Sequence, residues 1–574
     1  MKKLVILIII ICASILTGIL IPKKAIYIIF ENSGYYFIFV SFFLWAAYLF
    51  KFHYAQLKSL ILKHYDGLLL SSLLVILIFY IAPPKFKILN DETNLIGVSM
   101  SMFQSKKTSL PNQGFNLDYR SPDYKSSIVD KRPLLYPLLI SFIHSLRGYS
   151  AYNGFVVNFI FGILALFTFY LCIYDHFPRI YALISILIIA SLPNFVMWVT
   201  SSGFETLNLF FIICTLYLFN RVIVTRNIQN TELLFLTLVL VSQCRYESAI
   251  FTLAFLFLLP MLLKKETIAS FTAITYLTPA LFIPTIWSTR LYANQPIVNK
   301  VLSGVAQVPN LYEAFSFSNL ITNSATNLIV FLGLDPHLGF SWIVSALSLA
   351  GFYLMTKRLI VERRSTSLQF RTMWLYGVAT FCLLYFIQVS FYLGNMALYT
   401  QNRFAMAYLP FMVFPAVFFV HRFLNHTNFS KKIIVFIFFV FHLLYFWPYG
   451  SQQLLVHTGS IPYEYNKTLS YLEDNFKRNS NILIISERPN LYIVQYKGAV
   501  DFTYANQNME KIKDHYGKEF DHILVLQKCL HETRAPLKTS RLNTSYRLVS
   551  LKTLNLTQTE YLKISKLITD NQSQ

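Results

Sequence analysis

The sequence predicts an all-α polytopic membrane bundle of about 13 transmembrane helices, followed by a small α/β domain. The 574-residue chain is 55% hydrophobic but only 13% charged, whereas about a quarter of the residues in soluble domains are charged. Its mean hydropathy is +0.49. Apolar runs of roughly 20 residues, the length that crosses a bilayer, recur as far as residue 448.

Short polar loops separate these apolar runs, and their basic residues fall mainly in alternate loops. This bias predicts a cytoplasmic N-terminus, and it accounts for the net charge of +22 without a nucleic-acid partner. A cleaved signal peptide is the alternative for residues 1–21, but no small-x-small cleavage site precedes residue 21, which favours a retained span. The expected spans are 4–21, 35–50, 67–82, 152–174, 180–198, 203–219, 233–247, 248–263, 268–287, 339–356, 372–392, 404–420 and 433–448.

The predicted topology gives a membrane domain over residues 1–448 with outer loops at 83–151 and 288–338, and a soluble extracytoplasmic domain over 449–574. We expect an integral protein of the bacterial inner membrane. The tail has the alternating pattern of a small α/β unit without a glycine-rich phosphate loop. Its expected elements are a helix at 463–477, strands at 482–485 and 491–495, a helix near 506–516, and a strand at 522–526.

Charged residues gather at the span edges that this topology places on the outer face. Ionisable groups in such positions are functional candidates by default. Carboxylates can act as general bases, and arginine or lysine can hold a phosphate and stabilise charge that builds on it. This combination at a lipid boundary suits a lipid phosphate that carries a sugar. The candidates are Asp91 and Glu92 after the third span, Lys131, Arg132 and Tyr136 in the first outer loop, Glu205, Arg245 and Glu247, and Arg403.

No His/Cys/Asp cluster in the sequence has metal-ligand spacing, so we predict no resident metal. The sequence leaves open a divalent cation that bridges a carboxylate and a phosphate. The six cysteines form no disulfide framework, because Cys529 is the only one outside the apolar segments.

The region from Asp91 to about Glu247 resembles the C-type superfamily of integral-membrane glycosyltransferases. The closest likeness is to the dolichyl-phosphate-mannose protein mannosyltransferase and lipid A aminoarabinose transferase group. One departure from the family pattern is Leu134, which stands where the family has a second proline. The matching elements are Asp91-Glu92, Arg132-Pro133-Leu134-Leu135-Tyr136-Pro137, Ser202-Gly203-Phe204-Glu205-Thr206, Arg245-Tyr246-Glu247, and Arg403 ahead of Pro410.

This resemblance implies an inverting enzyme that moves a sugar from a polyprenyl-monophosphate carrier to an acceptor hydroxyl on a glycan, lipid or protein. Asp91 corresponds to the general base, and Glu92 and Glu205 orient the acceptor or the sugar. Four basic residues are expected to bind the donor phosphate, and three further residues are expected in the site. The basic residues are Lys131, Arg132, Arg245 and Arg403, and the others are Glu247, Tyr136 and His337.

Two other functions remain open from the sequence. A ligase or polymerase that uses polyprenyl-diphosphate-linked glycans also needs arginine with an acid or histidine outside the membrane, and loop 288–338 with His337 fits that pattern. A polytopic transporter is the second alternative, although transporters place polar groups near the bilayer midplane rather than at one edge.

Overall fold

The computed structural model describes residues 2–115, 123–262, 268–292, 315–335, 339–362, 367–424, 429–445, 455–477, 480–516, 519–543 and 546–568. The chain divides into two compact units. Unit 1 comprises Met1–Pro84, Lys131–Tyr136 and Phe155–Gln452, and unit 2 comprises Lys85–Asp130, Pro137–Gly154 and Gln453–Gln574. The boundary at Gln453 lies close to the expected start of the tail domain at 449, and unit 2 also takes in most of loop 83–151.

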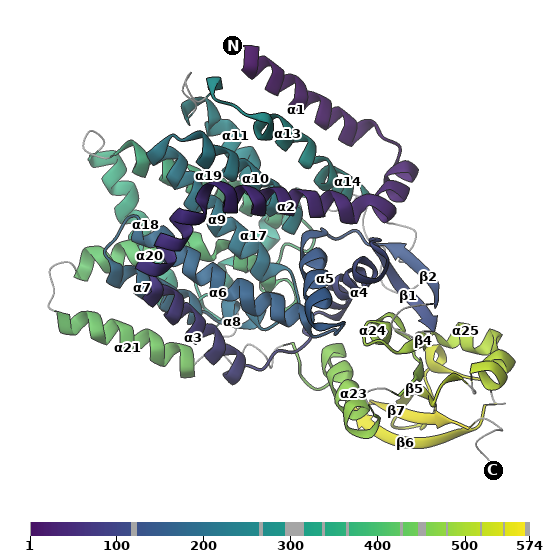
Figure 1. Ribbon diagram of the computed structural model, residues 1–574. Helices are drawn as coiled ribbons and strands as arrows, with labels where there is room; N and C mark the ends of the chain where they lie inside the picture. The colour runs from purple at the N-terminus through teal and green to yellow at the C-terminus, as the bar shows by residue number, and fades with distance from the viewer. Residues whose placement is uncertain are drawn as a thin grey trace. The chain divides into compact units, whose positions relative to one another are not determined.

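Unit 1 is built of helices (Figure 1). A sharp bend of 71° separates α7 from α8, so the two form a broken span or a re-entrant pair. The helices of unit 1 are α1 (Lys2–Leu20), α2 (Lys23–Lys63), α3 (Tyr65–Ile81), α6 (Asn153–Tyr174), α7 (Arg179–Ala190), α8 (Pro193–Val199), α9 (Glu205–Thr225), α10 (Ile228–Cys244), η1 (Glu247–Ala249), α11 (Ile250–Leu262), α13 (Ala273–Leu281), α14 (Ile283–Tyr292), α17 (Phe317–Phe331), α18 (Trp342–Val361), α19 (Leu368–Ser390), η2 (Asn402–Tyr408), α20 (Leu409–Leu424) and α21 (Phe429–Tyr445).

Each expected span falls on one of these helices or on a consecutive pair of them. By length and composition, 7 of the described helices can cross a membrane, or up to 8 if the bent pair counts as one span. The multi-pass membrane fold is therefore confirmed, and the larger number of spans stays a prediction.

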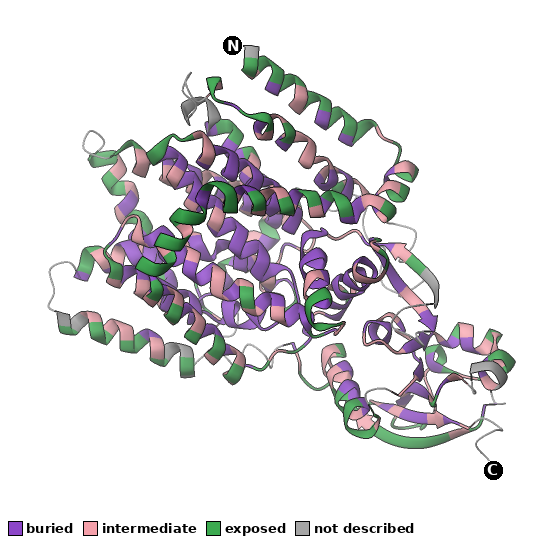
Figure 2. Ribbon diagram, in the orientation of Figure 1, coloured by how far each residue is buried: buried purple, intermediate pink, exposed green. Residues whose placement is uncertain are grey.

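The burial of the helices separates a lipid-facing shell from an interior (Figure 2). Only 17% of the most apolar window of α1 and 22% of that of α2 is buried, against 78% for α9 and 67% for the helix that begins at Asn402. Exposed apolar surface on this scale needs a lipid covering. The interior helices α9, η2 and α20 are the ones that carry the polar groups described below.

A buried carboxylate on the interior helix α10 ties α2 and α13 to it. Glu232 on α10 is 1% exposed, and its two oxygens accept from four donors. Tyr48 of α2 donates to Oε2 at 2.8 Å. The backbone N–H and the hydroxyl of Thr272, at the start of α13, donate to Oε1 at 3.1 and 2.6 Å, and the hydroxyl of Thr275 donates at 2.6 Å. A buried carboxylate satisfied in this way holds the packing in register.

Unit 2 contains one seven-stranded sheet in the order β2-β1-β4-β3-β5-β7-β6. Strands β4, β3 and β5 are parallel, and the outer pairs are antiparallel. The elements are α4 (Leu89–Ser105), β1 (Ser109–Phe115), β2 (Asp123–Val129), α5 (Leu135–Arg147), α23 (Ile461–Asn475), β3 (Ile482–Ile485), α24 (Asn490–Ile493), β4 (Gly498–Val500), α25 (Phe502–Gln507), η3 (Lys511–Tyr516), β5 (His522–Leu530), η4 (Lys538–Ser540), β6 (Leu548–Asn555) and β7 (Glu560–Leu567).

The first outer loop and the tail share this sheet. Gly114 of β1 pairs with Ala499 of β4, and the Gln113 amide donates to the Asp501 carboxylate at 2.7 Å. One element of the tail was predicted wrongly, because the strand expected at 491–495 overlaps the helix α24 (Asn490–Ile493) and the strand comes later, at β4. A short apolar run fits a buried helix as well as a buried strand, and here Pro489 sets the N-terminal turn of a helix.

We predict that Glu232→Ala lowers the free energy of unfolding by about 3 kcal/mol, because four donors lose a charged acceptor inside the helix packing. Thermal unfolding of the purified protein in detergent measures the change. The matched control is Glu362→Ala, where the carboxylate is 47% exposed and pairs with Arg358 one turn away, with an expected loss within about 0.5 kcal/mol. Equal shifts in the two variants would contradict the anchoring role of Glu232.

Candidate active site

The site in unit 1 begins with Glu205, in the first turn of α9. A carboxylate there is favoured because the N-terminal end of a helix carries partial positive charge. The turn before α9 is tight, and a methyl group on Gly203 would overlap the Glu205 carboxylate. Asn158 of α6 fixes this turn by donating to the carbonyls of Ser201 and Gly203 at 2.7 and 2.8 Å. Glu205 is 3% exposed, so its charge requires a partner.

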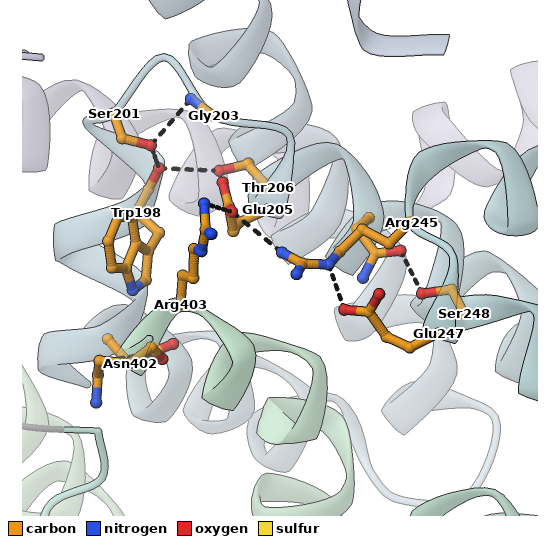
Figure 3. Close-up of polar contacts among 12 residues, drawn as sticks. Trp198, Ser201, Gly203, Glu205, Thr206, Arg245, Glu247, Ser248, Asn402 and Arg403 are labelled. Carbon is orange, nitrogen blue, oxygen red and sulfur yellow. Dashed lines mark hydrogen bonds and ion pairs between the residues drawn. The ribbon is translucent and has the colours of Figure 1, made fainter. Parts of the chain in front are cut away.

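Arg245 supplies that partner from the break between α10 and η1. Its Nη1 lies 3.1 Å from Glu205 Oε1, and its Nε lies 2.5 Å from Glu247 Oε1 (Figure 3). The side chains of Arg245, Glu205 and Glu247 are 7%, 3% and 15% exposed. Ion pairs shielded from water to this extent are screened far less by salt than surface pairs are. One guanidinium thus joins carboxylates from two different elements.

Two aromatic rings lie close to the same guanidinium. The Arg245 Cζ atom lies 4.8 Å from the ring centre of Phe204 and 4.7 Å from that of Phe404. A cation near the face of an aromatic ring gains stabilisation that increases as water is removed. Phe204 precedes α9 and Phe404 belongs to η2, so these contacts also join the turn before α9 to η2.

Arg403 is the second guanidinium at Glu205. Its Nη1 lies 3.7 Å from Glu205 Oε1, farther than the 3.1 Å of Arg245. Its Cζ lies 5.5 Å from the ring centre of Phe404. Figure 3 shows Arg403 and Arg245 approaching the Glu205 carboxylate from different elements. The ion pair of Arg403 with Glu205 is therefore the longer of the two, and the side chain of Arg403 is 13% exposed.

The element around Arg132 joins the site through a backbone contact. The hydroxyl of Tyr246, the residue after Arg245, donates to the carbonyl of Lys131. Lys131 and Arg132 are partly exposed, and Tyr136 is fully buried. The buried tyrosine anchors the end of this element, while the two basic side chains retain access to solvent.

Several polar residues that support the site were not predicted as part of it. Asn194 of α8 donates to the carbonyl and the side-chain oxygen of Asn402 at 2.8 and 2.6 Å, next to Arg403. Ser248 donates to Asn208 at 2.7 Å, which joins η1 to α9. All of these residues except Arg403 are fully buried. Their only signal in the sequence is a polar residue within an apolar run, and many satisfied core residues share that signal.

Asp91 and Glu92 lie in unit 2, in the first turn of α4. Glu92 is 2% exposed, and its Oε2 accepts from the backbone N–H groups of Lys87 and Ile88 at 2.5 and 2.6 Å. This carboxylate therefore satisfies the backbone at the start of its own helix. Burial lowers the pKa of the Lys87 ammonium to about 7, although the Glu92 carboxylate acts in the opposite direction. Asp91 is half-buried, so it is the more accessible of the two acids.

The last two predictions about the site concern His337 and a metal ion. His337 lies outside the described residues. Within the described ranges, no group of three or more His, Cys, Asp or Glu residues could hold a metal ion.

Residues 131–289 match the family model described as dolichyl-phosphate-mannose-protein mannosyltransferase. No curated protein matches the sequence. Solved structures with a similar fold include ArnT from Cupriavidus metallidurans bound to undecaprenyl phosphate, with a TM-score of 0.50, 10% identity, and coverage of 86% of this chain and 97% of that one. An oligosaccharyltransferase from Archaeoglobus fulgidus gives a TM-score of 0.46, 11% identity, and coverage of 80% and 67%. The arabinosyltransferase EmbB from Mycobacterium smegmatis gives a TM-score of 0.30 at 9% identity, with coverage of 70% of this chain and 42% of that one.

Residues 131–289 are thus similar to a mannosyltransferase family, and the likeness to ArnT shows a common multi-pass fold. The resemblance to the C-type superfamily of integral-membrane glycosyltransferases is thereby confirmed. The matched region contains Lys131, Arg132, Glu205, Arg245 and Glu247, whereas Asp91 and Arg403 lie outside it.

We predict that Arg245→Ala lowers the free energy of unfolding by about 3–5 kcal/mol, because it leaves two shielded carboxylates without a partner. Arg403→Ala is the matched comparison, with an expected loss of about 1 kcal/mol, because its nitrogen lies farther from Glu205. Thermal unfolding in detergent at fixed pH measures both. A larger loss for Arg403→Ala would contradict the assignment of Arg245 as the structural centre of the cluster.

Proposed function

We propose that this protein is an inverting glycosyltransferase, which moves a sugar from a polyprenyl-monophosphate carrier to an acceptor hydroxyl on the outer face of a bacterial inner membrane. The N-terminus is cytoplasmic and the C-terminal tail extracytoplasmic in this proposal. The observation that carries it is the cluster of Glu205, Arg245 and Arg403, built within the mannosyltransferase-like region and η2. The ArnT structure contains undecaprenyl phosphate, the lipid-phosphate part of such a donor without the sugar.

Arg403 is the best placed of the basic residues to bind the donor phosphate. Arg245 already pairs with two carboxylates, at 3.1 and 2.5 Å, so its positive charge is compensated within the protein. Arg403 pairs with Glu205 at the longer distance of 3.7 Å. A guanidinium can give a phosphate two parallel hydrogen bonds, and Arg403, with a side chain 13% exposed, is the more accessible of the two arginines. Lys131 and Arg132, both partly exposed, supply further positive charge.

Glu205 acts by positioning in this proposal. Its carboxylate accepts a hydrogen bond from Arg245 at 3.1 Å and lies 3.7 Å from Arg403. It thereby fixes the positive groups that stabilise the negative charge developing on the leaving phosphate. Glu247 orients Arg245 from the opposite side.

Asp91 is the proposed general base. The acceptor oxygen attacks the anomeric carbon while Asp91 takes its proton, and the bond from that carbon to the phosphate oxygen breaks. The phosphate leaves with the electron pair, and the configuration at the carbon inverts. The protein supplies alignment and charge stabilisation, which dominate when the leaving group is already a phosphate.

We expect Asp91→Asn to lower kcat by about 10²–10⁴-fold, the usual contribution of a general base, without changing thermal unfolding. The assay is transfer from a radiolabelled polyprenyl-monophosphate sugar by the purified protein. Asp474→Asn is the matched control, because Asp474 is an exposed acid of unit 2, on α23. Retention of more than half the activity in Asp91→Asn would remove Asp91 as the base.

Arg403→Ala should raise the donor KM by roughly 10–100-fold, the equivalent of a lost charged hydrogen bond. The acceptor KM should stay within about twofold of its normal value, since the phosphate belongs to the donor. Arg422→Ala, at the exposed C-terminal end of α20, is the control. An unchanged donor KM would show that Arg403 only anchors η2.

A direct comparison of donors separates this activity from that of a diphosphate-dependent ligase. The purified protein is incubated with an acceptor extract and either a polyprenyl-monophosphate sugar or a polyprenyl-diphosphate-linked glycan. We expect transfer from the monophosphate donor. Transfer from the diphosphate donor alone would replace the proposed function with a ligase.

A further inference from the structure

A crevice in unit 2 lies where the parallel strands of the sheet change direction. The chain leaves β3 toward β4 on one side and then returns past β3 to β5 on the other, which gives the local order β4-β3-β5. In open α/β sheets, ligands bind outside the carboxyl ends of the strands at such a switch point. Ser486, Glu487 and Arg488 follow β3 directly at this end, and all three line the crevice.

Charged side chains from α23, β5 and the segment after β3 converge on this crevice. Glu464 of α23 and Lys528 of β5 form an ion pair at 2.8 Å. Glu487 Oε1 accepts from the hydroxyls of Thr539 and Ser540, each at 2.5 Å. The floor is apolar or aromatic and includes Leu526, Tyr465 and Tyr492, which are 2%, 1% and 3% exposed. The crevice is therefore a rigid surface with polar groups at its mouth.

Several of these polar groups have capacity for a ligand. In the part of the chain that the structure describes, the Arg488 guanidinium makes no hydrogen bond or ion pair. Glu464 uses only Oε2 and Glu487 only Oε1, so the second oxygen of each carboxylate accepts no hydrogen bond from a described residue. The mouth therefore offers carboxylate oxygens as acceptors and the N–H groups of a guanidinium as donors. Neighbouring hydroxyl groups on one ring can satisfy both kinds, because each hydroxyl donates and accepts.

The size of the crevice indicates how such a ligand would lie. Its enclosed volume is about 10 Å³, about enough for one water and far below the roughly 300–1,000 Å³ of pockets that enclose a ligand. A ring therefore rests across the mouth with its hydroxyls directed inward, and such a shallow contact gives weak binding.

We propose that this crevice binds a sugar residue of the acceptor glycan and so helps to select the acceptor. The assignment to an acceptor rests on the proposed function, whereas sugar binding itself does not. Glu464, Glu487 and Arg488 contact the hydroxyls, and Lys528 holds Glu464 in place. A single shallow site gives dissociation constants on the order of 1 mM.

Saturation-transfer difference NMR tests sugar binding on the full-length chain. The protein is placed in lipid nanodiscs that contain neither glycolipid nor maltoside detergent, because both would compete. The probes are glucose, galactose, mannose, N-acetylglucosamine and glucuronate, tested without any donor lipid. We expect at least one sugar to bind. Arg488→Ala and Glu487→Gln should each weaken that binding about tenfold, and the exposed Arg541→Ala serves as the control.

The outcomes separate this site from the transfer activity. Absence of binding by every sugar, or equal binding by Arg488→Ala and Arg541→Ala, would overturn the proposal. If transfer is active, Arg488→Ala should raise the acceptor KM with kcat and donor KM unchanged, and an unchanged acceptor KM would overturn the acceptor assignment. Sugar binding that depends on Arg488 in a protein without transfer activity would support the site while the proposed function fails.

Discussion

The ion pairs of Arg245 are the interaction on which the site depends. Its guanidinium is 7% exposed and contacts Glu205 and Glu247 from two directions. Removing such charges from water costs several kcal/mol for each ion, and the cost is offset only when every charge has a close partner. Phe204 and Phe404 add aromatic contacts to the same cation. Because these groups come from α9, η1 and η2, satisfying a single guanidinium brings three separate parts of the chain together.

The backbone around this cluster shows the same constraint. Irregular backbone at membrane depth survives only where protein or water satisfies its polar groups. The 71° bend between α7 and α8, the turn before α9 and the break after Cys244 are all irregular. Asn158 satisfies two carbonyls in the turn before α9, Asn194 at the start of α8 satisfies the carbonyl of Asn402 at the start of η2, and both side chains are fully buried. The irregular segments and the charged residues therefore occur together, because each needs the buried polar environment that the other provides.

The sequence alone predicts much of this architecture, because hydropathy reports the membrane directly. The apolar runs locate the helices, and the charges of Glu205, Arg245 and Arg403 are conspicuous in an apolar chain. Contacts between distant segments could not be predicted, since no local pattern encodes them. The pairing of β1 with β4 and the bond between Gln113 and Asp501, 388 residues apart, are examples. The backbone bonds of Glu92 could not be predicted either, because Asp91 and Glu92 look equivalent in the sequence and only the folded turn distinguishes them.

The unequal distances from Glu205 to its two arginines fit the requirements of catalysis. An interaction accelerates a reaction only if it is stronger in the transition state than in the ground state. Arg245, at 3.1 Å from Glu205 and 2.5 Å from Glu247, is already satisfied and contributes a nearly constant field. In the proposed reaction Arg403, at 3.7 Å from Glu205, contacts the phosphate, and this contact becomes more favourable as negative charge grows on the leaving oxygen. Glu205 in this proposal holds Arg245 close and Arg403 at a longer distance, a division of roles that two equally tight ion pairs could not provide.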